Sequence, residues 1–87
     1  MRGADEGAAR LVLYSRAYCH LCHDMLAQLQ ALQGEFRFNL EVVDVDADPE
    51  LERRYNELVP LLMHEAMELA RWRLDPGALR AYLAEIG

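Results

Sequence analysis

The chain has 87 residues, enough for one domain with a single core and too few for two. Hydrophobic residues make up 53% of it and charged residues 28%, a balance typical of a soluble globular protein and not of a disordered tail or a membrane span. The net charge of −6 weighs against phosphate binding, which needs a basic face, so we expect no nucleic-acid partner. No stretch approaches the length of a transmembrane helix, so we expect no membrane partner.

Residues 1–9 are small or charged and offer nothing to bury, so we expect a flexible tail before a single domain over residues 10–87. This stretch has no apolar h-region, and we therefore expect no signal peptide and a cytoplasmic chain. The chain has two cysteines, set close together. In a cytoplasmic protein such a pair is typical of catalytic, redox or metal-binding chemistry.

The first expected element is an apolar strand over residues 10–14, followed by a helix that begins near Cys19. Apolar residues then recur at intervals of three and four, which indicates one buried helix face. They are Cys22, Met25, Leu26, Leu29 and Leu32. Gly34 is the expected end of this helix.

A second strand is expected over residues 36–45, where apolar and polar residues alternate. The alternation shifts by one position at Val43, which predicts a β-bulge near Val42. Asp48 and Pro49 then begin a second helix, which carries Leu51, Tyr55 and Leu58 inward and ends by residues 59–60.

Two short strands over residues 61–63 and 67–71 are expected to form a hairpin around a turn at residues 64–66. Asp75 and Pro76 begin the last helix, whose apolar face carries Leu79, Tyr82, Leu83 and Ile86. The predicted order is β-α-β-α-β-β-α. This order indicates an α/β fold with a four-stranded mixed sheet and helices on both faces.

The two cysteines lie where the first strand passes into the first helix, in Cys19-His20-Leu21-Cys22. The unpaired amides and the positive end of the dipole at a helix N-terminus favour an anion, and in such settings the pKa of a cysteine falls below its free value of roughly 8.5. Cys19 is therefore the candidate nucleophile. Cys22 lies one turn further along, close enough to form a disulfide with Cys19 and to act as the resolving thiol.

Four features together resemble the glutaredoxin-like branch of the thioredoxin superfamily. They are the strand ending in Leu13-Tyr14-Ser15, the Cys19-His20-Leu21-Cys22 motif, Val59-Pro60 before a hairpin, and a terminal helix after Leu74-Asp75. The resemblance implies a thioredoxin-like fold, with Cys19 as nucleophile and Cys22 as resolving cysteine. It also implies that Pro60 is a cis-proline facing the site and that the Val59 backbone pairs with a bound thiol substrate. Arg16 matches a basic position that holds a glutathione carboxylate and stabilises the thiolate.

The chain departs from the glutaredoxin pattern before its last helix. Glutaredoxins usually have a Gly-Gly pair there, whose backbone N–H groups reach glutathione, whereas this chain has Ala70-Arg71-Trp72-Arg73-Leu74-Asp75. Trp72, between two arginines, is interpreted in two ways: as a wall of a replacement binding site, or as a lid on the core. Asp75 is expected to cap the last helix and to meet a ligand amine.

The predicted function is that of a monomeric thiol–disulfide oxidoreductase with no bound cofactor. Its substrate is a disulfide-containing protein or a glutathione mixed disulfide. Its reductant is glutathione, as a co-substrate, or a thioredoxin-reductase-like protein. The alternative is a thioredoxin-fold module that binds an iron–sulfur cluster, a metal or a client protein without redox turnover.

Two other interpretations of the motif are weaker. Cys19 to His23 matches the haem attachment pattern, but the expected strands do not fit an all-helical cytochrome. His20, His23 or His64 could join the cysteines at zinc, but a second ligand pair at a fixed spacing is missing.

Overall fold

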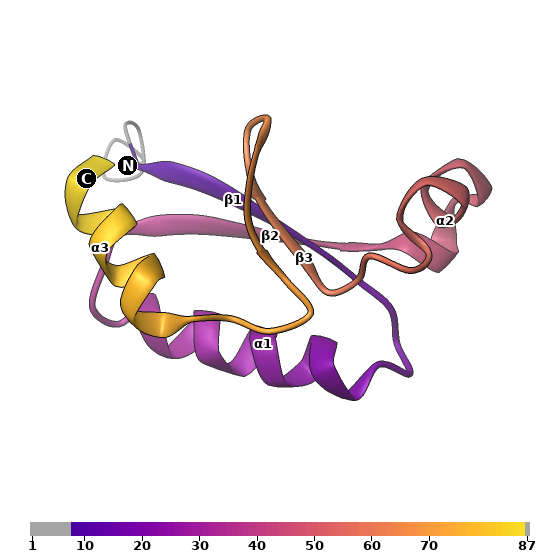
Figure 1. Ribbon diagram of the computed structural model, residues 1–87, viewed down its shortest axis with the longest axis horizontal. Helices are drawn as coiled ribbons and strands as arrows, with labels where there is room; N and C mark the ends of the chain where they lie inside the picture. Colours follow the sequence, from indigo (N-terminus) through magenta and orange to yellow (C-terminus); the bar gives the residue numbers. More distant parts are fainter. Residues whose placement is uncertain (1–7, 87) are drawn as a thin grey trace, which may run out of the picture.

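A computed structural model describes residues 8–86 of the chain. The elements in order are β1 (Ala9–Ser15), α1 (His20–Leu32), β2 (Phe38–Asp44), the short 3₁₀ turn η2 (Val45–Ala47), α2 (Pro49–Tyr55), β3 (Leu61–His64), β4 (Met67–Arg71) and α3 (Pro76–Ile86). The predicted order β-α-β-α-β-β-α is confirmed (Figure 1). Of the expected tail, residues 1–7 lie outside the described residues, and Ala9 already belongs to β1. No helix within residues 8–86 is long and apolar enough to cross a membrane.

The four strands form one mixed sheet in the order β2-β1-β3-β4. β1 is parallel to β2, to which it is joined through α1, and antiparallel to β3. β3 and β4 form the predicted antiparallel hairpin. β1 is an interior strand that ends at Ser15, and residues 16–19 connect it to α1, so the first turn of α1 lies beyond the C-terminal end of β1.

The hydrophobic core lies between the sheet and two helices, α1 and α3, which lie on the same side of it in Figure 1. It is built from Leu11, Leu13, Met25, Leu29, Leu32, Phe38, Leu62, Leu74, Leu79 and Leu83. α2 lies beyond the C-terminal end of β1, where the rings of Tyr55 and Tyr14 stack at a centroid distance of 4.3 Å. Side chains alternate along a strand, so Tyr14 faces away from the core that Leu13 enters, and α2 lies toward the second face of the sheet.

The β-bulge predicted near Val42 is wrong. The β1–β2 register runs without a break from Ala9 opposite Phe38 to Ser15 opposite Asp44. The shift in the hydrophobic pattern marks the end of the strand instead: the Asp44 carboxylate accepts a hydrogen bond from the Asp46 amide at 3.0 Å and turns the chain into η2, which buries Val45. The sheet's irregularity lies between β3 and β4, beside Leu62 and Met63.

The predicted starts of the last two helices are confirmed, but their inward faces are smaller than expected. Asp48 caps α2 by accepting from the Glu50 amide at 2.9 Å, yet none of the α2 residues is fully buried. In α3, Leu79 and Leu83 are buried, whereas Ile86, predicted to face inward, is 42% exposed. The core cluster ends at Leu83, and Ile86 lies in the last turn of the helix beyond it.

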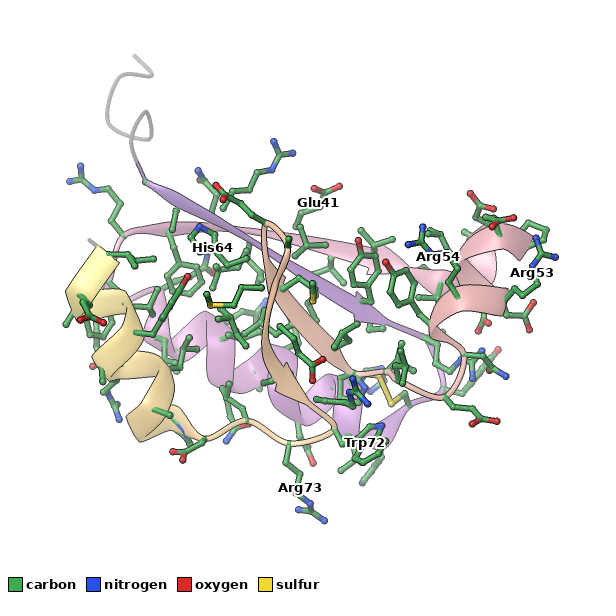
Figure 2. All side chains as sticks on the ribbon, turned by 45° about the horizontal axis from the view of Figure 1, so that its top comes forward. Glu41, Arg53, Arg54, His64, Trp72 and Arg73 are labelled. Atoms are coloured by element: carbon green, nitrogen blue, oxygen red, sulfur yellow. A yellow bond between two sulfur atoms is a disulfide. The ribbon has the colours of Figure 1, made fainter. Side chains whose placement is uncertain are left out.

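His64 was expected in the hairpin turn, but it is the last residue of β3. It pairs with Leu11 across the sheet, so it lies on the core face, and its Nδ1 is hydrogen-bonded to the Tyr82 hydroxyl of α3 (Figure 2). The turn itself is made by residues 65–66, with Glu65 in the left-handed region at φ 56°.

Candidate functional site

Cys19 is the N-cap of α1. Its backbone is extended, at φ −110° and ψ 111°, and its Sγ accepts a hydrogen bond from the Cys22 amide at 3.1 Å. The first amides of a helix have no intrahelical acceptor, so the sulfur here takes the place of the usual capping oxygen. The first turn of α1 contains no acidic residue. A negative charge on Cys19 is therefore favoured by the helix end and meets no carboxylate in that turn.

Cys19 and Cys22 form a disulfide, with their Cα atoms 5.1 Å apart. Cys22 is only 1% exposed and lies in the face of α1 that packs on the core, whereas Cys19 is partly exposed. An incoming sulfur can therefore reach Cys19 and not Cys22. This difference suits the predicted roles of Cys19 as the attacking thiol and Cys22 as the resolving thiol.

The peptide bond between Val59 and Pro60 is cis; Pro60 is buried and Val59 is half-buried. Trp72, just after β4, holds this loop at two points. Its backbone N–H donates to the Pro60 carbonyl at 2.8 Å, and its indole Nε1–H donates to the Glu57 carbonyl at 3.1 Å. Trp72 itself is in the left-handed region at φ 69°, a conformation that normally favours glycine.

Trp72 is not a lid on the core, because 49% of it is exposed. It lines a groove of about 410 Å³ between α1 and the segment that links β4 to α3. Leu21, Asp24 and Gln28 line the groove from α1, and Arg73 and Leu74 from the linking segment. Leu21 lies between the two cysteines in the first turn, so the groove begins beside the disulfide.

Arg71, one of the two arginines that flank Trp72 in the interpretation of a binding wall, does not line this groove. Its guanidinium donates two hydrogen bonds to the Glu68 carboxylate, at 3.0 and 2.8 Å, and lies 5.8 Å from the centroid of the Trp72 ring. The hydrogen bond to Glu68 raises the pKa of Arg71. Of the three residues in that interpretation, only Trp72 and Arg73 line the groove.

Arg16 is held by the segment around α2. Its guanidinium donates two hydrogen bonds to the Asp46 carboxylate, at 3.2 and 2.7 Å, and a longer one to the Asn56 carbonyl at 3.5 Å. The hydrogen bond to Asp46 raises the pKa of Arg16. A ligand carboxylate would therefore have to compete with Asp46 for this arginine. The role of Arg16 toward glutathione stays a prediction.

Asp75 caps α3, as predicted. Its carboxylate accepts from the Ala78 amide at 3.2 Å, and its carbonyl accepts from the Leu79 amide at 3.0 Å. Asp75 is exposed but does not line the groove, and its contact with a ligand amine stays a prediction.

Sequence reasoning missed the α1 side of the groove. Leu21, Asp24 and Gln28 are spaced at three and seven residues, which places them on one stripe of the helix, next to the buried stripe that begins at Cys22. That spacing was a usable signal. The Glu57 carbonyl and the Asp46 carboxylate were not predictable, because their partners are 15 and 30 residues away in the sequence.

A metal site within one chain finds no support in the part of the structure described here. Residues 8–86 contain no group of three or more histidine, cysteine, aspartate or glutamate side chains placed to hold a metal ion. His20 and His23 are exposed on α1, and His64 is bonded to Tyr82.

Comparison with known proteins agrees with the geometry. The model of the glutaredoxin-like domain family (DUF836) matches residues 10–84. An uncharacterised protein of Mycobacterium tuberculosis is 30% identical over 77 residues, which are 83% of this chain and 79% of the relative. The solution NMR structure of protein Ne2328 from Nitrosomonas europaea is similar with a TM-score of 0.75 and 41% identity, over 91% of this chain and 95% of that one.

A second solved structure, the X-ray structure of protein XcR50 from X. campestris, has a TM-score of 0.70 and 33% identity, covering 86% of this chain and 96% of that one. Fasciola hepatica thioredoxin has a TM-score of 0.62 at 19% identity, over 98% of this chain and 86% of that one, which shows a common fold. The fold is thus the predicted thioredoxin-like fold, and the chain belongs to the glutaredoxin-like domain (DUF836) family.

Proposed function

We propose that the protein is a thiol–disulfide oxidoreductase that uses Cys19 and Cys22 as a dithiol/disulfide pair. One observation carries the proposal: a partly exposed sulfur caps α1 and accepts a backbone hydrogen bond, while a buried second sulfur is bonded to it. The first sulfur is placed to be a stabilised thiolate, and the second is placed to displace whatever the first has captured.

The reaction has two exchange steps. The Cys19 thiolate attacks one sulfur of a substrate disulfide, a Cys19–substrate disulfide forms, and the other substrate sulfur leaves as a thiolate that takes up a proton. The Cys22 thiol then loses its proton and attacks the Cys19 sulfur, which forms the Cys19–Cys22 disulfide and releases the second substrate thiol. The substrate gains two electrons and the enzyme loses two.

The remaining parts of the proposed cycle concern substrate and reductant. The Val59 backbone and Pro60 would align the substrate chain beside Cys19, and the groove under Trp72 would hold what flanks the substrate sulfur. Two reductant thiols, from glutathione or from a thioredoxin-reductase-like protein, would return the Cys19–Cys22 disulfide to the dithiol. We place the reaction in the cytoplasm, where a closely spaced cysteine pair is typical of catalytic, redox or metal-binding chemistry.

The first test is a redox titration. The protein is equilibrated in glutathione buffers of defined ratio, the free thiols are alkylated, and the masses are measured. We expect a reversible two-electron transition between roughly −120 and −270 mV, the range of known oxidoreductases. A protein that forms no Cys19–Cys22 disulfide at any ratio would rule out the dithiol mechanism.

The second test separates the two sulfurs. Cys19→Ser should abolish disulfide reduction, because no thiolate remains at the helix end, whereas Cys22→Ser should accumulate the mixed disulfide on Cys19. Turnover is followed with a chromogenic disulfide, and the mixed disulfide is identified by mass. Wild-type turnover in Cys19→Ser would contradict the assignment of the nucleophile.

A further inference from the structure

Several large apolar side chains around the disulfide are exposed to solvent. Tyr18, immediately before Cys19, is 98% exposed, and it makes no hydrogen bond or ring contact with any described residue. Leu21 is 37% exposed and Trp72 is 49% exposed. Aromatic residues and arginine are enriched in protein interfaces. We use the name docking surface for Tyr18, Leu21, Trp72 and Arg73.

The groove gives the docking surface a hollow for one apolar group. Two of its lining residues, Met25 and Leu74, are buried core side chains, so its floor is apolar. Leu21 and Trp72 form opposite walls near the disulfide end. An extended chain crossing the site next to Cys19 could therefore place a side chain between α1 and the linking segment.

Arg73 adds an uncompensated positive charge. The arginines with a carboxylate partner in the structure include Arg10, Arg16, Arg53, Arg71 and Arg80. Arg73 has no such partner within residues 8–86. Figure 2 shows its side chain extending away from the body of the molecule. A guanidinium in that position would pair with a carboxylate of a large partner lying over the groove more readily than with a small ligand bound inside the groove.

Three donors that would favour glutathione are already used: two backbone amides of the linking segment and the Arg16 guanidinium. The Trp72 amide donates to the Pro60 carbonyl at 2.8 Å, and the Arg73 amide donates to the Arg71 carbonyl at 2.7 Å. Arg16 is held by Asp46. The two free carboxylates of glutathione would therefore find no open backbone donor at Trp72 or Arg73 and no uncompensated charge at Arg16.

We propose that the docking surface selects protein disulfides over glutathione mixed disulfides, which rests on the proposed function. The occupant is an extended segment of a client protein that carries its disulfide cysteine. An apolar side chain beside that cysteine fills the groove between Leu21 and Trp72, and a nearby carboxylate pairs with Arg73.

The test uses short peptides whose single cysteine is joined to thionitrobenzoate, so that each attack by Cys19 releases a coloured thiolate. One peptide carries leucine and glutamate beside the cysteine, a second replaces glutamate with glutamine, and a third replaces leucine with serine. The glutathione–thionitrobenzoate disulfide is the fourth substrate. Wild type, Arg73→Gln, Leu21→Ser and Arg53→Gln are reduced beforehand and freed of reductant, and kcat/KM is taken from the second-order rate of thionitrobenzoate release in a single turnover. Arg53→Gln removes the same charge at α2 and serves as the matched control.

We expect wild type to prefer the leucine–glutamate peptide over the glutathione substrate by about tenfold or more, which corresponds to one well-formed charged contact. Arg73→Gln should remove the preference for glutamate over glutamine, and Leu21→Ser the preference for leucine over serine. Arg53→Gln should keep both preferences. Equal kcat/KM for the four substrates, or a best rate with glutathione, would overturn the docking proposal while leaving the oxidoreductase intact. No release of thionitrobenzoate from any substrate would overturn the proposed function and the docking proposal together.

Discussion

Cys19 lies between the end of β1 and the start of α1, in a position that favours a thiolate. Its sulfur accepts the Cys22 amide at 3.1 Å, and the first turn that follows contains histidines and no acid. Both features favour the thiolate over the thiol. They depend on local geometry, which is why residue types and spacing alone were enough to point to Cys19.

The ion-pair partner of Arg16 could not be predicted from residue types. Its position before the motif matched a thiolate-stabilising arginine, but the structure gives its charge a partner, Asp46, that lies 30 residues further along. Charge compensation depends on which loops come together. It could not be predicted from the motif.

We predict that the double variant Arg16→Gln/Asp46→Asn leaves the pKa of the reduced Cys19 thiol nearly unchanged, because the Arg16–Asp46 ion pair has no net charge. Arg16→Gln alone should raise the pKa of Cys19, because it leaves the Asp46 carboxylate uncompensated, and Asp46→Asn alone should lower it, because it leaves the arginine uncompensated. The pH dependence of Cys19 alkylation, measured with Cys22→Ser in the background, checks both. A rise in the double variant as large as the rise in Arg16→Gln would mean that the guanidinium acts directly on the Cys19 sulfur.

At the scale of elements, the spacing of apolar residues predicted the strands, with a period of two, and the helices, with a period of 3.6. The ends and irregularities of these elements depend on tertiary contacts, so the spacing did not predict them. The phase shift at Val43 was taken for a bulge, but it marks the end of β2, because the Asp44 carboxylate turns the chain into η2. The same limit applies to α3, whose apolar pattern continues to Ile86 although the core ends at Leu83.

Substitutions at the two ends of the apolar pattern of α3 should differ in their effect on the stability of the protein. Leu83→Ala removes a buried side chain that is 4% exposed and should lower the free energy of unfolding by about 2–5 kcal/mol. Ile86→Ala deletes the same number of carbon atoms from the same helix at an exposed site and should cost less than about 1 kcal/mol. Urea unfolding of the oxidised proteins measures both. Equal losses would mean that Ile86 is packed in solution.

At the scale of the whole molecule, the order of elements predicted two pairings: the parallel β1–β2 pair joined through α1 and the antiparallel β3–β4 hairpin. It did not predict that β3 pairs antiparallel with β1, although α2 joins β3 to β2. The groove was a different matter. Its walls are α1 and a segment that follows 40 residues later, and the left-handed backbone of Trp72 is unusual for a bulky residue. The absence of the Gly-Gly pair indicated where the site differs from that of a glutaredoxin. It did not indicate that the backbone amides of Trp72 and Arg73 donate hydrogen bonds to carbonyls of the same chain.

One long-range ion pair should make the stability of the molecule depend on pH. Glu35, after α1, accepts two hydrogen bonds from Arg80 of α3, at 3.0 and 2.9 Å, and this contact lowers the pKa of the Glu35 carboxyl. Above the ordinary range of a glutamate carboxyl both folded and unfolded chains are ionised, and only the folded chain has the pair. As the pH falls through that range, the unfolded chain binds its proton first, so the stabilisation is lost.

We therefore expect Glu35→Gln to lower the urea midpoint at neutral pH and the gap from wild type to close on acidification. The gap should be small and should also shrink in high salt, because both side chains are about half exposed. Arg80→Gln should show the same pH dependence. Glu85 lies on α3, like Arg80, but forms no ion pair with residues 8–86, so Glu85→Gln should have the same urea midpoint as wild type at neutral pH. A gap for Glu35→Gln that stays constant from neutral to acidic pH would mean that the side chain acts through packing and not through its charge.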